Sequence, residues 1–384
     1  MRIAFLTSEN PHDRCSWSGI HYYTMRALER HCGTVYSLGP VNLKRRSMLR
    51  VTARLIRALT GKGYDFTHNP WLSRKYGKIF TEKLRGADYD LIYASSASTE
   101  MAHVQTNVPI IYLADATFAN AVDYYPECRD LLDISKRHGR FVERQAIQKS
   151  SFLLYPSEFA AQSAINEFGA ASSKVRVIPW GANLEAAPPA QMALNRERSE
   201  VCRLLFLGVQ WDRKGGDLAF QTLLELKKRG VKAKLTVCGC TPPARISDPD
   251  LVVTGFLNKN IPRDRERIEW LLLNSEFLLL PTRAEFYGIV FCEASAFGLP
   301  SVTTDTGGVS GAVRHRINGL LLPLTAGPGE YANAIMGVFG DEASYRALVR
   351  SSRAEYESRL NWDAWGGTVS NLIKEHLSLE PRPS

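Results

Sequence analysis

The chain has 384 residues, of which 45% are apolar and 23% charged, which is typical of a globular protein of two or three domains and excludes a disordered or fibrous chain. Its longest apolar runs fall far below the roughly 20 residues that cross a bilayer, so no transmembrane helix is predicted. The formal net charge of +9 favours partners that carry phosphate, such as nucleotides, nucleic acid or anionic lipid. The seven irregularly spaced cysteines indicate reduced thiols, and the start of the chain has no signal-peptide pattern, so a cytoplasmic location is expected.

Short apolar segments alternate with helical patterns through the first half of the chain. Several of these segments are rich in β-branched or aromatic residues, as buried parallel strands are. The predicted strands cover residues 2–7, 35–38, 91–94, 110–113, 152–155 and 175–178, and the predicted helices include residues 20–30 and 131–150.

A stretch of dense positive charge at residues 44–62 is interleaved with apolar residues at helical spacing. Such a basic amphipathic helix either lies on an anionic membrane surface or is a solvated helix whose apolar side packs inward, and the spacing leaves both interpretations open. If the first holds, the protein is peripheral at the inner face of a membrane. The cations are Lys44, Arg45, Arg46, Arg50, Arg54, Arg57 and Lys62, and the apolar residues are Met48, Leu49, Val51, Leu55, Ile56 and Leu59.

A linker with an Ala/Pro-rich start is predicted over residues 186–200, and a second series of strands and helices follows it. The alternation predicts the α/β class, with a doubly wound parallel sheet of the Rossmann-like kind in each half and ligands beyond the carboxyl ends of the strands. The predicted strands cover residues 204–208, 234–238, 251–253, 277–280 and 301–304, and the helices include residues 217–229 and 288–297.

The segment at residues 281–300 carries the strongest chemical pattern. A buried strand leads into a helix near Gly288, whose first amides and positive dipole end can hold a pyrophosphate. Glu285 precedes the helix, and Glu293 lies about five residues into it, roughly 7 Å along the axis. A carboxylate suits a vicinal diol, so Glu293 could hold a ribose while Glu285 meets a transferred sugar. Glu293 could instead be a surface charge, but its apolar neighbours argue against a solvated helix face.

The segment at residues 206–217 places two cations and two glycines between a strand and a helix. Arg213 and Lys214 follow a strand that ends at Gly208, where a cation pair suits a departing nucleoside diphosphate. The alternative is a solvated basic turn, which the adjacent Gly215–Gly216 pair makes less favourable.

Together these segments resemble the signature of glycosyltransferase family four, a retaining family. The resemblance lies in Glu285 and Glu293 with seven residues between them, in the Gly-Leu-Pro turn at residues 298–300, and in the Arg-Lys-Gly run that starts at Arg213. It implies that Glu293 binds the donor ribose, that Glu285 contacts the donor sugar, and that Arg213 and Lys214 contact the diphosphate. The phosphate-binding amides would come from Tyr287, Gly288, Ile289 and Val290.

Weaker matches add candidates in both halves. Phe256 lies at the strand-to-loop position where the nucleobase usually rests in this family. An ordinary strand-to-loop turn would account for the same pattern equally well. Gly19 matches a glycine loop that faces the leaving phosphate, and His21 beside it is either an acceptor ligand or a structural histidine. Asp115 ends a buried strand, where it either orients a hydroxyl of acceptor or donor or caps a turn.

The resemblance implies a GT-B fold, in which two Rossmann-like domains face a central cleft. We expect an acceptor-binding domain at residues 1–185, onto which a helix at residues 366–384 packs, and a donor-binding domain at residues 200–365. The expected activity is retaining transfer of a hexose from a nucleoside-diphosphate sugar to a hydroxyl of a glycan, lipid or small molecule. A UDP-sugar is expected ahead of a GDP-sugar, with no metal and no cofactor besides this donor.

Two alternatives stay open from the sequence. The first is a sugar-nucleotide epimerase of similar two-domain build. The second is a non-catalytic module that binds nucleotide sugars or nucleic acid. A basic stripe with stacking aromatic residues, which nucleic-acid binding would favour, is not evident, so we expect no nucleic-acid partner.

Overall fold

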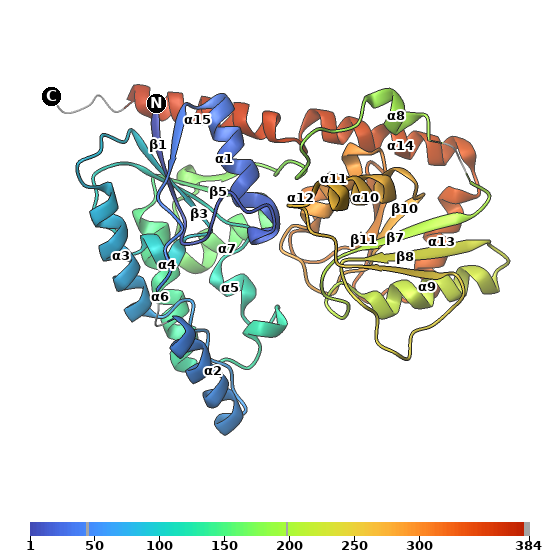
Figure 1. Cartoon of the computed structure of the whole chain (residues 1–384), viewed down its shortest axis with the longest axis horizontal. Helices are drawn as coiled ribbons and strands as arrows, with labels where there is room; N and C mark the ends of the chain where they lie inside the picture. Colours follow the sequence, from blue (N-terminus) through green and yellow to red (C-terminus); the bar gives the residue numbers. More distant parts are fainter. Residues whose placement is uncertain (44–45, 197–198, 380–384) are drawn as a thin grey trace. The chain divides into compact units, whose positions relative to one another are not determined.

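The computed structural model describes residues 1–43, 46–196 and 199–379, and the chain forms two compact units (Figure 1). Unit 1 consists of Met1–Ile178 and the segment that begins at Gly366, and unit 2 consists of Pro179–Trp365. Each unit is built around a six-stranded sheet in which neighbouring strands are parallel. The predicted α/β class with two doubly wound sheets is therefore confirmed. Among the described helices, none combines the length and apolarity that crossing a bilayer requires.

The sheet of unit 1 has the strand order β2-β1-β3-β4-β5-β6. Its central strands β3 and β4 are buried along their whole length, because helices cover both faces of a parallel sheet. The strands are β1 (Arg2–Leu6), β2 (Thr34–Ser37), β3 (Leu91–Ser95), β4 (Ile110–Leu113), β5 (Phe152–Tyr155) and β6 (Val175–Val177).

The helices of unit 1 include α3, for which the sequence analysis named no helix. Asn69 caps it by accepting hydrogen bonds from the amides of Trp71 and Leu72, and Pro70 occupies its first position. The helices are α1 (Ile20–His31), α2 (Arg46–Thr60), α3 (Pro70–Leu84), α4 (Ser98–Met101), α5 (Phe118–Ala121), α6 (Asp133–Lys149), α7 (Glu158–Phe168) and α15 (Trp362–Leu379), whose first residues belong to unit 2. Of the predicted basic segment, Lys44 and Arg45 lie outside the described residues.

The sheet of unit 2 has the strand order β12-β11-β10-β7-β8-β9. The strands are β7 (Cys202–Leu207), β8 (Ala233–Cys238), β9 (Leu251–Gly255), β10 (Phe277–Leu280), β11 (Ser301–Thr304) and β12 (Gly319–Leu322). The helices are α8 (Ala190–Leu194), α9 (Gly216–Lys228), α10 (Pro262–Leu273), α11 (Ile289–Ala296), α12 (Val309–Ala312), α13 (Pro328–Phe339) and α14 (Glu342–Ser358).

Two sequence expectations differ from the structure of unit 2. The segment predicted as a linker contains the short helix α8, whose Ala193 is fully buried, so part of it packs against the unit rather than running free. The sequence analysis also named no strand after residue 304, whereas β12 pairs with β11 from Ser301 opposite Gly319. β12 starts with Gly319 and is followed by Pro323, so its apolar run is only three residues long and does not stand out.

Candidate functional site

Arg213, Lys214 and Glu285 lie beyond the carboxyl ends of neighbouring strands in unit 2. Strands β7 and β10 pair directly, with Leu204 opposite Phe277. The loop after β7 carries Arg213 and Lys214, and the loop after β10 carries Glu285. Because both strands run in the same direction, these two loops meet at one edge of the sheet.

Glu285 forms an ion-paired cluster with both cations. Its carboxylate binds Lys214 Nζ directly and lies 3.5 Å from Arg213 Nη1. Glu285 and Lys214 are almost fully buried, and burial lowers the pKa of the Lys214 ammonium, although Glu285 opposes this shift. Arg213 Nη1 also donates to the carbonyl of Ala284 at 2.8 Å, which links the two loops. Two positive groups and one carboxylate thus lie together beside the end of β10.

Two glycines allow the backbone to approach closely at this edge. Gly215 has a φ of +75°, and a Cβ there would lie 2.0 Å from the carbonyl oxygen of Pro281. Gly288, the N-cap of α11, has a φ of +83°, and a Cβ there would lie 2.4 Å from the ring of Phe291. Both positions favour glycine. The first amides of a helix have no partner within it, so the start of α11 can donate to an anionic ligand.

Glu293 on α11 is 1% exposed and forms an ion pair with Lys259, whose Nζ lies 2.5 Å from Glu293 Oε1. The sequence analysis did not select Lys259. It belongs to the loop between β9 and α10 and lies 34 residues before its partner, so no local motif joins the two. The possibility that Glu293 is a solvated surface charge is thereby excluded.

The other donor-site candidates differ in which of their groups could meet a ligand. The Tyr287 hydroxyl donates to the carbonyl of Trp180 at 3.1 Å, and burial raises the pKa of this phenol well above its usual value. The side chain of Tyr287 is therefore occupied by a contact within unit 2, and only its backbone amide could bind a ligand. The sequence analysis predicts a backbone contact for Ile289 and Val290 as well. Phe256 directly follows β9, and its side chain is 61% exposed.

The candidates in unit 1 lie beyond β1 and β4. Gly19 begins α1 with a φ of +89°. His21 is buried, with Nδ1 2.9 Å from Ser95 Oγ and Nε2 3.9 Å from the Glu9 carboxylate. Burial lowers the pKa of His21 to about 4, against the influence of Glu9, so the ring is neutral at pH 7. Asp115 follows β4 and is half-buried, and the N-cap of α5 is Thr117 rather than Asp115.

A second ionic cluster, which the sequence analysis did not identify, joins the half-buried residues just before α3 to the buried Glu143 on α6. His68 Nδ1 lies 2.5 Å from Asp65 Oδ2, and the buried Glu143 accepts a hydrogen bond from the Tyr112 hydroxyl at 3.3 Å. Burial alone would lower the pKa of His68, but Asp65, and then Glu143 and Glu100, raise it to about 9. Asp65 and His68 are three residues apart, but Tyr112 and Glu143 lie far from them in the sequence, and no motif connects the two pairs.

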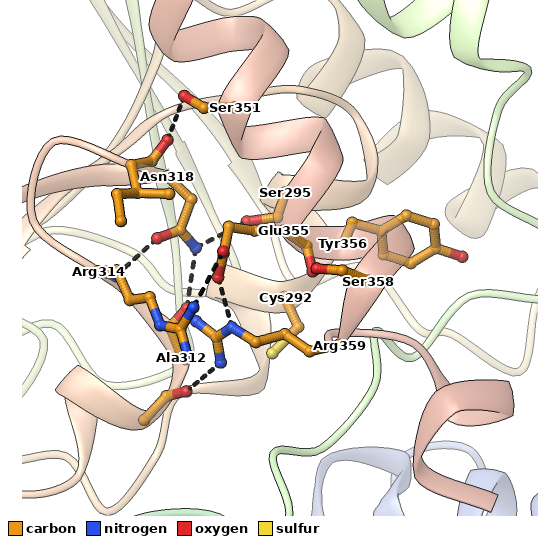
Figure 2. Close-up of polar contacts among 12 residues, drawn as sticks. Cys292, Ser295, Ala312, Arg314, Asn318, Ser351, Glu355, Tyr356, Ser358 and Arg359 are labelled. Carbon is orange, nitrogen blue, oxygen red and sulfur yellow. Dashed lines mark hydrogen bonds and ion pairs between the residues drawn. The ribbon is translucent and has the colours of Figure 1, made fainter. Parts of the chain in front are cut away.

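A polar cluster around the end of α14 joins α11, α12 and the segment before β12 (Figure 2). Asn318 donates to Ser295 Oγ on α11 at 3.1 Å and to the carbonyl of Ala312 on α12 at 2.8 Å. Arg359 donates to the carbonyl of Gly311 at 2.8 Å, and Glu355 binds both Arg359 and Arg314. At the other end of α12, the amide of Gly308 donates to the carbonyl of Glu285 at 3.1 Å. The cluster therefore fixes both α11 and the loop of Glu285.

An Asp-x-Asp sequence, a spacing that holds metal ions in other transferases, occurs at residues 88–90 and at residues 248–250. Asp248 and Asp250 both lie 2.6 Å from Lys227 Nζ, and Asp90 accepts a hydrogen bond from the backbone amide of Arg2 at 2.8 Å. Within the part of the chain that the structure describes, no three His, Cys, Asp or Glu side chains gather as a metal site would require.

Solved structures share this arrangement of two sheets. Sucrose-phosphate synthase from Thermosynechococcus elongatus superposes with a TM-score of 0.70 at 16% identity, over 99% of each chain. Anabaena HepE, solved in complex with UDP-glucose, superposes with a TM-score of 0.61 at 18% identity, over 99% of this chain and 100% of its own. The fold is thus the GT-B fold of glycosyltransferases.

Sequence comparison specifies the family. Residues 22–186 match the model "Glycosyltransferase Family 4", and residues 202–341 match "Glycosyl transferases group 1". D-inositol 3-phosphate glycosyltransferase of Corynebacterium jeikeium is 23% identical over 333 residues, which span 82% of this chain and 73% of that protein. The chain belongs to the group 1, or family four, glycosyltransferases. It is an enzyme of a retaining hexosyltransferase family that takes sugar from nucleotide sugars.

Proposed function

We propose that this enzyme transfers a hexose from a UDP-sugar, bound at the carboxyl edge of the unit 2 sheet, to a hydroxyl group of an acceptor bound by unit 1. The observation that carries the proposal is the cluster of Arg213 and Lys214 with Glu285, beside the helix start at Gly288. It combines positive charge for a leaving diphosphate with a carboxylate beside the sugar. The UDP-glucose in HepE supports a UDP-sugar ahead of a GDP-sugar.

Each candidate has a role in this proposal. Arg213, Lys214 and the amides at Tyr287, Gly288, Ile289 and Val290 bind the diphosphate, and Gly19 is a further diphosphate contact in the proposal. Glu293 binds the ribose, and the exposed ring of Phe256 stacks on the base. Glu285 contacts the donor sugar. Asp115 orients the attacking hydroxyl. His21, which is neutral at pH 7, forms a hydrogen bond with the substrate that receives the sugar.

In the proposed reaction, the bond between the anomeric carbon and the diphosphate oxygen breaks while the acceptor oxygen bonds to the same face of the sugar. The acceptor proton passes to the departing diphosphate. The helix start at Gly288 and the two cations stabilise the negative charge that forms on the leaving group, so the proposed mechanism uses no metal. Retention follows because the new bond forms on the face that the leaving group vacates.

We also propose that helix α2 rests on an anionic membrane surface. In Figure 1, α2 projects from its unit, away from the sheet. Leu49 packs against the core of unit 1, so only one apolar side of the helix is covered. An apolar stripe faces solvent beside a stripe of exposed arginines. The apolar stripe consists of Val51, Leu55 and Leu59, which are 54%, 58% and 84% exposed, and the basic stripe consists of Arg50, Arg54 and Arg57. Paired stripes of this kind favour lipid over a purely aqueous surface.

The test of the catalytic proposal is Glu285→Gln, which keeps the shape of the side chain and removes its charge. We expect hydrolysis of UDP-glucose, and transfer where an acceptor is supplied, to fall roughly 10²-fold or more, while UDP still binds. Glu266→Gln, on the exposed face of α10, is the matched control and should leave activity unchanged. Full activity in Glu285→Gln contradicts the proposal. Release of an epimerised nucleotide sugar without acceptor would favour the epimerase.

A further inference from the structure

The backbone of Lys259 is held in place by contacts within the loop that carries it, independently of Glu293. The amide of Asn258 donates to Asp264 Oδ2 at 2.7 Å, and Arg265 Nη1 donates to the carbonyl of Lys259 at 2.8 Å. Both partners belong to the first turn of α10. Phe256 lies three residues earlier in the same loop. The loop that would meet the base therefore also supplies the cation that meets Glu293.

The Lys259–Glu293 pair has the chemistry of a prepared hydrogen-bond acceptor. Glu293 is 1% exposed, and burying a carboxylate costs free energy unless a cation or hydrogen-bond donors contact it. Lys259 is its ion-pair partner among the described residues, and the distance of 2.5 Å to Oε1 indicates a charge-assisted hydrogen bond. A carboxylate has about four lone-pair sites, so the contact with one ammonium leaves capacity for two hydroxyl groups.

We propose that Lys259 is a positioning residue that holds the Glu293 carboxylate in the orientation that reads the 2′- and 3′-hydroxyl groups of the donor ribose. The inference rests on the proposed role of Glu293. Without Lys259, the Glu293 side chain would lose its contact at Oε1 and would turn more freely, so its oxygens would no longer be held toward the ribose. The pair thus makes the site selective for ribonucleoside diphosphates over their 2′-deoxy forms, and it contributes to donor binding more than to the chemical step.

The experiment measures the affinity of the whole enzyme for UDP and for 2′-deoxy-UDP by calorimetry, together with KM and kcat for UDP-glucose hydrolysis. For Lys259→Met we expect UDP to bind roughly tenfold more weakly and the preference for UDP over 2′-deoxy-UDP to be largely lost. KM should rise by a similar factor, and kcat should fall less than threefold. Lys259→Arg should restore most of the affinity, because it keeps the cation. Lys259→Gln replaces the Met variant if the latter does not fold.

Two further variants distinguish the role of Lys259 from the proposed role of Glu293 in binding the ribose. Lys232→Met removes an exposed lysine that pairs with Glu200 at 3.4 Å and should change neither affinity. If Glu293→Gln loses the preference for UDP while Lys259→Met keeps full affinity and preference, the role of Lys259 is wrong and that of Glu293 stands. If Glu293→Gln behaves as the unchanged enzyme does, Glu293 does not read the ribose, and both fail.

Discussion

In unit 2, the two carboxylates of the proposed donor site lie at low exposure, and each has a cationic neighbour. Glu285 is matched by Lys214 and Arg213, and Glu293 by Lys259. Breaking a buried pair by removing one member costs about 3–5 kcal/mol, since the remaining charge has neither water nor partner. In unit 2 the matched charges are the proposed donor ligands, so a donor must compete with contacts that already exist within the protein.

In unit 1, the pair of Asp65 and His68 gives a prediction about pH. Burial would raise the pKa of Asp65, but His68 and hydrogen bonds from Thr67 hold it at about 2, whereas the pKa of His68 is raised to about 9. The stabilisation of the folded state by protonated His68 is complete below its ordinary pKa of 6.5 and is lost as the pH rises through 9. The contribution of Asp65 is present above 3.8 and is lost as the pH falls through 2.

We therefore expect His68→Gln to lower the free energy of unfolding by about 1–3 kcal/mol between pH 4 and 6.5, and by much less above pH 9.5. Urea unfolding at pH 6 and at pH 9.5 measures both values. Asp65→Asn should behave in the same way, and the double variant should cost less than the sum of the two single variants. An effect of His68→Gln that does not change with pH would show that the ion pair does not stabilise the fold.

At the scale of elements, the strands were the most predictable part of the fold. Strands such as β10 and β4 are continuous apolar runs that occupy the buried centre of a sheet, and burial on both faces forces that composition. The short helix α8 and the strand β12 were not predicted, because tertiary packing rather than local pattern stabilises them. At the proposed donor site, the motif around α11 predicted Glu285 and Glu293. Lys259 could not be predicted, because only the folded sheet brings the loop after β9 close to α11, which follows β10.

Helix α2 gives a prediction at the scale of an element. Leu55→Gln with Leu59→Gln should strongly reduce binding to vesicles of phosphatidylcholine and phosphatidylglycerol, and Arg54→Gln should weaken it about fivefold, since one basic side chain near an anionic surface contributes about 1 kcal/mol. Vesicle co-sedimentation measures both effects. Trp270→Ala, which removes a half-exposed aromatic from α10, is the control. Equal binding to pure phosphatidylcholine, or none to either vesicle, would exclude the anionic surface as a partner.

At the scale of the whole molecule, the chain passes between the units twice, once at residues 178–179 and once at residues 365–366. The segments at these two passages are bonded to each other within unit 2. The amide of Ala182 donates to the carbonyl of Leu360 at 2.9 Å, and Trp362 Nε1 donates to Asn183 Oδ1 at 2.9 Å. A Cβ on Gly181 would lie 2.2 Å from the amide nitrogen of Trp362, so the two segments are in close contact.

The second passage predicts how a truncation acts. From Gly366 onward, α15 packs on unit 1. Ser370 Oγ donates to the carbonyl of His31 at 2.9 Å, and the ring centroids of His376 and Phe152 lie 4.9 Å apart. Removing residues 366–384 should therefore destabilise unit 1 and leave unit 2 nearly unchanged. Hydrogen exchange should speed up in β1 and β5 but not in β7 or β10. Equal acceleration in both units would mean that they unfold as one.

Because unit 2 is a single uninterrupted stretch, Pro179–Trp365, whereas unit 1 is assembled from both ends of the chain, the two halves differ in how they can be exchanged. A chimaera with a related enzyme can receive a foreign unit 2 as one cassette, provided that both junctions and the paired segments 181–183 and 360–362 come from the same parent. Grafting unit 1 instead requires two separate pieces that find each other during folding. The proposed donor and acceptor specificities are therefore recombined most simply by exchanging unit 2.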